Sequence, residues 1–211
     1  MIEDTSTDAP GGTGARFSRR GLLLGMALAV PAGVLATVPP RRSAGALIVA
    51  ARRQVGVTLS YDPGYTTLAF PGGDVPRGKG VCTDVLVRAY RDAFGLDLQA
   101  LVNADMRANF SAYPRRWGLA RPDRSIDHRR VPNLATFFAR RQARLPIPAE
   151  PDGWRPGDIF TSIVGGRLPH IGIVSAGPPG TVIHNIGRGA REEVALFDHM
   201  LTGRYRWALD G

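Results

Sequence analysis

The sequence predicts one α+β domain in which helices come first and an antiparallel sheet follows. Apolar side chains repeat at helical spacing in several stretches between residues 43 and 144. From residue 158 onward, short runs rich in β-branched residues alternate with glycine and proline turns, as in antiparallel strands. Helices followed by strands are the pattern of an α+β domain. The 211 residues, 44% of them hydrophobic, suffice for one domain with a sizeable core and some additional chain.

Four helices are expected in the first part of the domain. Ser43 can cap the first, which has one apolar face. The second is expected to begin near Cys82, and Gly95 can end it in a left-handed conformation. Asp97 can cap the third helix, and the fourth should span roughly residues 133–144. These boundaries place Cys82 in the first turn of a core-facing helix.

The C-terminal third of the chain predicts a sheet. Three strands are expected over residues 158–164, 170–175 and 181–187, joined by glycine-rich turns into a meander. A short helix over residues 192–201 and a final strand over residues 205–209 are expected to complete the domain.

The first 36 residues are typical of an export signal. Paired arginines at Arg19 and Arg20 precede an apolar run, the arrangement of a twin-arginine signal. The run is short for a membrane-spanning helix, which needs about 20 residues. Residues 37–44 then read as a linker and residues 45–211 as the domain. We therefore expect a periplasmic or other extracytoplasmic protein, with an uncleaved N-terminal anchor as the alternative.

The charge indicates which partners are plausible. The formal net charge of +9 comes mostly from arginines spread along the chain. Such a surface favours anionic polymers and anionic membrane surfaces. The sequence lacks an aromatic-interleaved RNA motif and zinc-finger spacing, so we expect no specific nucleic-acid partner, no cofactor and no metal ion. The oligomeric state stays open.

Cys82 is the single cysteine of the chain. Exported proteins usually pair their cysteines, so a lone one is free, intermolecular, buried and inert, or reactive. At a helix N-terminus, unpaired N–H groups and the helix dipole favour a thiolate and can also stabilise an oxyanion. Such a nucleophile still needs an imidazole to take and return the proton.

Two histidines are placed to assist it. His170 and His184 stand on strands joined by a tight turn, and an even-sum register puts both on one face of the sheet. With His170 opposite Ile186, His184 lies on the adjacent diagonal. The working assignment is Cys82 as nucleophile, His170 as general base and acid, and His184 orienting His170. The alternative is that all three are packing residues.

Four segments resemble, in order, the motifs of NlpC-type cell-wall peptidases: Gly80–Asp84, Trp154–Phe160, Pro169–Val174 and Val182–Asn185. The wider pattern over residues 45–209 is similar to a bacterial family catalogued as domain of unknown function 1287. The first resemblance implies a papain-like fold and the same three catalytic residues. The chain departs from the usual aspartate-cysteine-serine-glycine at the nucleophile, reading Val81-Cys82-Thr83-Asp84 instead, which leaves the substrate specificity open.

Three further residues are candidates for substrate binding. Tyr61 lies in a glycine- and proline-rich stretch, residues 58–80, that holds aromatic side chains and predicts an ordered loop. The resemblance implies a tyrosine that assists the cysteine, a role open to Tyr61 or Tyr65. Asp84 suits the helix dipole but would oppose a nearby thiolate. His128 either lines the cleft or braces its loop.

Hydrolysis of an amide bond through a Cys82 thioester is the leading expectation, with peptidoglycan stem peptides as substrate. A second reading keeps the same residues but makes the protein an acyl ester or lipid hydrolase, or an acyltransferase. A third makes Cys82, His170 and His184 zinc ligands. A fourth is a non-catalytic wall-binding domain that its arginines attract to anionic polymers.

Overall fold

The computed structural model describes residues 41–210. The expected export signal, residues 1–36, therefore lies outside the described residues. Helix α1 (Ala44–Arg52) begins after Ser43, whose hydroxyl accepts the Ala46 N–H at 3.1 Å, as the sequence predicts. Among residues 41–210, no helix has both the length and the apolar character needed to cross a membrane.

The other helices follow the predicted order: α2 (Cys82–Phe94), α3 (Leu98–Ala108) and α4 (Val131–Arg140). Gly95 ends α2 with a φ of 67°, a left-handed conformation that glycine adopts without steric cost. Asp97 caps α3 through the Gln99 N–H. Both predictions are confirmed, whereas α4 begins and ends a few residues earlier than expected. Short 3₁₀ turns lie at Phe110–Ala112, Asp127–Arg129 and Pro151–Gly153.

One six-stranded antiparallel sheet forms the second half of the domain, in the order β3-β8-β4-β5-β6-β7. Its strands are β3 (Arg144–Leu145), β4 (Ile159–Val164), β5 (Leu168–Val174), β6 (Thr181–Asn185), β7 (Ala190–Val194) and β8 (Met200–Tyr205). The predicted meander of three strands is β4-β5-β6. Two short parallel strands, β1 (Ser60–Tyr61) and β2 (Lys79–Gly80), join the ends of the loop before α2. The α+β prediction is confirmed.

The prediction of a helix over residues 192–201 is wrong. Residues 190–194 form β7, which pairs with β6 along its whole length, and β8 follows from Met200 to Tyr205. The final strand thus ends where it was expected to begin. Glutamate, alanine and leucine favour a helix here only locally, and the tight connection after β6 brings the segment to a sheet edge instead.

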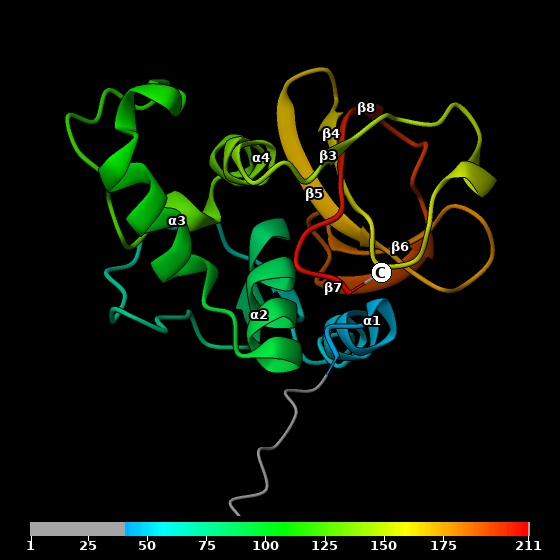
Figure 1. Ribbon diagram of the computed structural model, residues 1–211. Coiled ribbons are helices and arrows are strands. Elements are labelled where there is room, and N and C mark those ends of the chain that lie inside the picture. The colour runs from blue at the N-terminus through cyan, green and yellow to red at the C-terminus, as the bar shows by residue number, and fades with distance from the viewer. Residues whose placement is uncertain (1–40, 211) are drawn as a thin grey trace, which may run out of the picture. The chain divides into compact units, whose positions relative to one another are not determined.

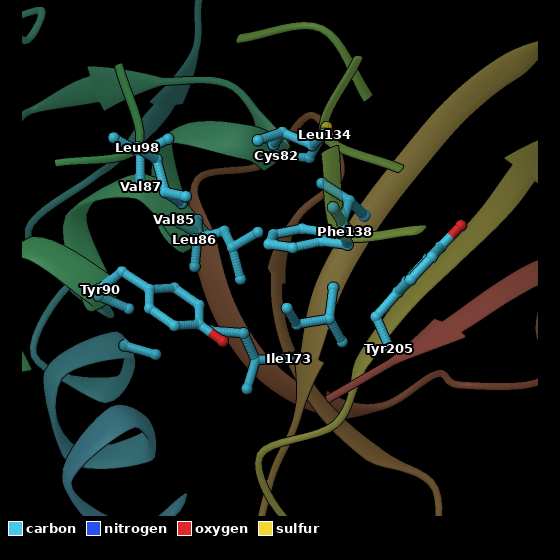
Figure 2. Close-up of a cluster of buried hydrophobic side chains, with 14 of the residues drawn as sticks. Cys82, Val85, Leu86, Val87, Tyr90, Leu98, Leu134, Phe138, Ile173 and Tyr205 are labelled. Atoms are coloured by element: carbon cyan, nitrogen blue, oxygen red, sulfur yellow. The ribbon is translucent and has the colours of Figure 1, made fainter. Parts of the chain in front are cut away.

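The sheet separates two groups of buried side chains. Helices α1, α2 and α4 contact one face, where Ile171 and Ile173 of β5 join the main core cluster (Figures 1 and 2). The other face carries Phe160 and Val174 in a smaller cluster. Because side chains alternate along a strand, His170 leaves β5 on the same face as Val174. This alternation decides where each candidate site residue lies.

Buried Arg88 holds the loop before α2 in place. Its guanidinium pairs with Asp74 at 2.9 Å and donates to the Val75 and Lys79 carbonyl oxygens and to the Thr58 hydroxyl. An arginine that is fully buried must have its donors satisfied in this way. The ordered loop predicted over residues 58–80 is therefore present, and it brings Tyr61 to the start of α2.

Candidate active site

Cys82 lies where three parts of the fold meet: the N-terminus of α2, the loop before it and strand β5. Its side chain belongs to one end of the main core cluster and is only 3% exposed (Figure 2). The residue nevertheless lines a cavity of about 620 Å³. The other lining residues include Tyr61, Tyr65, Arg116, Trp117, Arg130 and Pro169.

The thiol has hydrogen-bond partners from two elements. Strand β6 pairs with β5 only at Ile173 and Val174, so the Ile171 N–H is left without a partner in β6. The Cys82 sulfur accepts this N–H, and the Tyr61 hydroxyl lies 4.0 Å from the sulfur. Burial raises the Cys82 pKa to about 11, although both contacts oppose the shift. At neutral pH the residue is therefore a protonated thiol.

His170 and His184 form a hydrogen-bonded chain that ends at Glu193. The His170 Nε2 lies 2.9 Å from the His184 Nδ1, and the His184 Nε2 lies 3.0 Å from a Glu193 carboxylate oxygen. The pairing of Ile173 with Ile183 is the even-sum register that the sequence predicts. The expectation that one ring contacts the other on a shared face is confirmed.

Burial keeps both rings neutral. It lowers the His170 pKa to about 3, an effect to which His184 and His199 add. Burial also lowers the His184 pKa, against the opposing effect of Glu193. For Glu193, desolvation is outweighed by the bond to His184 and by nearby arginines, so its pKa lies below the ordinary value. The hydrogen-bonded chain therefore consists of a charged Glu193 carboxylate and two neutral imidazoles.

Among the described residues, no hydrogen bond joins the His170–His184–Glu193 hydrogen-bonded chain to the Cys82 thiol. Within residues 41–210, the partners of the Cys82 sulfur are Tyr61 and backbone N–H groups, and the His170 ring packs on Phe160 with centroids 5.8 Å apart. The backbone of His170 is close to the thiol all the same, because Pro169 lines the Cys82 cavity and the Ile171 N–H bonds the sulfur. The backbone beside His170 is therefore near the thiol, whereas the His170 ring lies on the Phe160 face of β5 and does not line the Cys82 cavity.

Asp84 has a different environment from the one its sequence position indicated. Its carboxylate accepts the Val81 N–H at 2.7 Å and two bonds from the Arg129 guanidinium at 2.9 and 3.0 Å. Both ionic side chains are almost fully buried. The acid is thus occupied by an internal ion pair that fixes the start of α2 to the loop before α4.

His128 does not line the Cys82 cavity. It is 2% exposed, burial lowers its pKa to about 4, and its Nδ1 has no hydrogen-bond partner among the described residues. Of the three residues predicted to bind substrate, Tyr61 alone is brought to the thiol. Asp158 caps the turn before β4 by accepting the Arg155 N–H, and it also pairs with Arg204.

Comparison with known proteins identifies the family. A model described as domain of unknown function DUF1287 matches residues 48–207. The chain belongs to the DUF1287 family. The uncharacterized protein YijF of Escherichia coli (strain K12) is 51% identical over 161 residues, which are 74% of this chain and 78% of that protein. All the site residues described above lie inside the DUF1287 match.

Sequence reasoning missed several residues of the candidate site. The sequence predicts a helix at Glu193, whereas the structure places this residue on β7, the strand beside β6. The strand pairing of His184 with Arg191 puts Glu193 on the neighbouring diagonal, so a correct strand prediction would have found it. Arg116 and Trp117 come from an irregular loop that no periodic signal covers. Among residues 41–210, no group of three or more His, Cys, Asp or Glu side chains is arranged to hold a metal ion.

Proposed function

We propose that this DUF1287 protein is an exported cysteine hydrolase with a papain-like, NlpC-type site that cleaves an amide bond, with peptidoglycan stem peptides as its substrate. The observation that carries the proposal is the position of the lone thiol. Cys82 opens α2, lines a large cavity and accepts a backbone N–H from the strand that carries His170. The motif resemblance and the expected export signal support a substrate in the cell wall.

The Glu193 carboxylate determines which ring nitrogens of His184 and His170 carry a hydrogen. A carboxylate only accepts hydrogen bonds, so the His184 Nε2 carries a hydrogen and its Nδ1 has a free electron pair. This Nδ1 accepts the hydrogen on the His170 Nε2. The His170 Nδ1 is therefore left unprotonated, and it is the nitrogen available as a base. Glu193 and His184 act through His170 and are positioning residues.

The reaction then proceeds by acyl transfer. The His170 Nδ1 takes the Cys82 proton as the sulfur attacks the amide carbon, and N–H groups at the start of α2 stabilise the oxyanion. The protonated ring gives its proton to the leaving nitrogen as the C–N bond breaks. Water next attacks the thioester, giving a proton to His170 and returning the sulfur as a thiol. In the structure the His170 ring lies on the Phe160 face of β5 and Cys82 belongs to the core on the other face. The mechanism therefore requires the His170 side chain to move to the thiol when substrate binds.

A specific observation favours a second candidate function. The cavity wall beside Cys82 is largely apolar, with Val81, Ile126, Val131 and Pro132 among its lining residues. An acyl chain fits such a wall, so hydrolysis of an acyl ester by the same Cys82 and His170 is the second candidate. Arg116 lines the cavity and has no ion-pair partner among residues 41–210, so its charge favours a peptide that carries carboxylate groups over an uncharged acyl chain.

Digestion of purified peptidoglycan tests the proposal. The protein, Cys82→Ala and His170→Ala are each incubated with peptidoglycan, and released fragments are identified by mass spectrometry. Arg167→Gln is the control, because it changes an exposed side chain outside both the Cys82 cavity and the hydrogen-bonded chain. Fragments released by the parent and the control, but by neither site variant, support the hydrolase and identify the bond. Binding to sacculi that all four proteins share, without any release, would favour the non-catalytic wall-binding domain.

A further inference from the structure

A second cavity of about 670 Å³ adjoins the Cys82 cavity. Tyr65 lines both, so its ring stands between them. The Tyr65 hydroxyl donates to the Asp123 carboxylate at 3.1 Å, which holds the ring in this position. A substrate bound at Cys82 and long enough to pass Tyr65 would therefore reach the second cavity.

The second cavity is strongly cationic. Arg107, Arg121 and Arg124 line it, and within residues 41–210 none of them forms an ion pair; Arg124 lies over the Phe70 ring. The single acid in the lining is Asp123, whose carboxylate is already engaged by Tyr65 and the Ser125 N–H. Three guanidinium groups against one carboxylate leave the cavity lining with a net positive charge, which favours an anion.

Asn103 provides an independent observation. Its side chain lines the second cavity, it is 8% exposed, and its amide makes no hydrogen bond within the described part of the chain. The Asn103 amide atoms are not among the buried polar atoms that lack a partner, so they are open to the cavity and the amide N–H groups are free to donate to a ligand. The Asn103 amide comes from α3, as does Arg107, so the two groups have a fixed spacing. A ligand oxygen in the cavity would satisfy both.

We infer that the second cavity is a binding site for an oxyanion, a carboxylate or phosphate group, carried by the substrate on the far side of Tyr65 from Cys82. Guanidinium groups bind both oxyanions through paired N–H donors, and the Asn103 amide donates a further hydrogen bond. Anion binding depends only on the cavity. Its role as a substrate site rests on the proposed hydrolase function.

Calorimetric titration of the full chain with inorganic phosphate and, separately, with succinate tests the site. The test variants are Asn103→Leu and the double variant Arg107→Gln/Arg121→Gln. The control is Arg53→Gln/Arg167→Gln, which removes the same charge from exposed positions outside the cavity. Unfolding in urea verifies that each variant is folded. Whichever of phosphate and succinate binds more tightly identifies the preferred anion as a phosphate or a carboxylate.

The expected result is saturable binding that weakens at least tenfold in the double arginine variant, about threefold in Asn103→Leu, and less than twofold in the control. Equal losses in the double variant and the control would overturn the site, because net charge alone would then explain binding. The absence of saturable binding of either anion would overturn it too. Specific anion binding together with no release of peptidoglycan fragments would keep the site and refute the proposed peptidoglycan hydrolase.

Discussion

Replacing Asp84 with asparagine should lower the free energy of unfolding by about 3–5 kcal/mol, the usual cost of removing one partner of a buried ion pair. The Asp84 and Arg129 side chains are 4% and 2% exposed, and two bonds of 2.9 and 3.0 Å join them. Without the carboxylate charge, Arg129 has only neutral acceptors: the new amide oxygen and the Gly64 and Asp62 carbonyl oxygens, the latter two at 3.3 and 3.2 Å. Such a loss is a large part of the roughly 5–15 kcal/mol by which domains are stable.

Urea unfolding provides the assay, and Asp92→Asn is its matched control. Asp92 pairs with Arg77 at 2.7 Å, but these side chains are 24% and 48% exposed, so the control should cost no more than about 1 kcal/mol. The denaturation midpoint should therefore fall far more for Asp84→Asn at an unchanged slope. Equal midpoints for the two variants would refute the assignment of Asp84 to a structural ion pair.

Three further predictions concern the site. Gly172→Ala should lower the free energy of unfolding by about 1–3 kcal/mol, measured in urea, because its methyl group would lie 2.6 Å from a Phe160 ring carbon. In the free protein, alkylation of Cys82 by iodoacetamide should rise about tenfold per pH unit from pH 7 to 10, since burial raises its pKa to about 11; a plateau below pH 8 would contradict this. Glu193→Ala should slow amide hydrolysis at least tenfold, which corresponds to about 1.4 kcal/mol of lost transition-state stabilisation. The ring ¹⁵N chemical shifts should report a changed His184 tautomer. An unchanged hydrolysis rate with unchanged ¹⁵N shifts would contradict the positioning role of Glu193.

Local signals predicted much of the fold. Ser43, Asp97 and Gly95 each act within one helical turn, so their capping roles are visible in the sequence. The register that brings His170 onto His184 follows from a short connection between two adjacent strands. Both kinds of prediction need only residues that are close along the chain.

The errors arise where distant contacts decide the structure. Residues 190–194 have a helical composition, yet pairing with β6 makes them a strand and brings Glu193 to His184. Asp84 and Arg129 are 45 residues apart, so no local pattern indicates their ion pair. The environment of a polar residue, and therefore its role, depends on such partners more than on its own position in a helix.

The most direct test of the central claim is to trap the thioester. The protein is mixed with soluble peptidoglycan fragments and quenched in acid, and its mass is measured intact and after proteolysis. The account predicts an added acyl mass on the peptide that contains Cys82, with release of the corresponding amine, and no adduct on Cys82→Ala. Fragment cleavage that continues at the parental rate in Cys82→Ala, without any adduct, would contradict it.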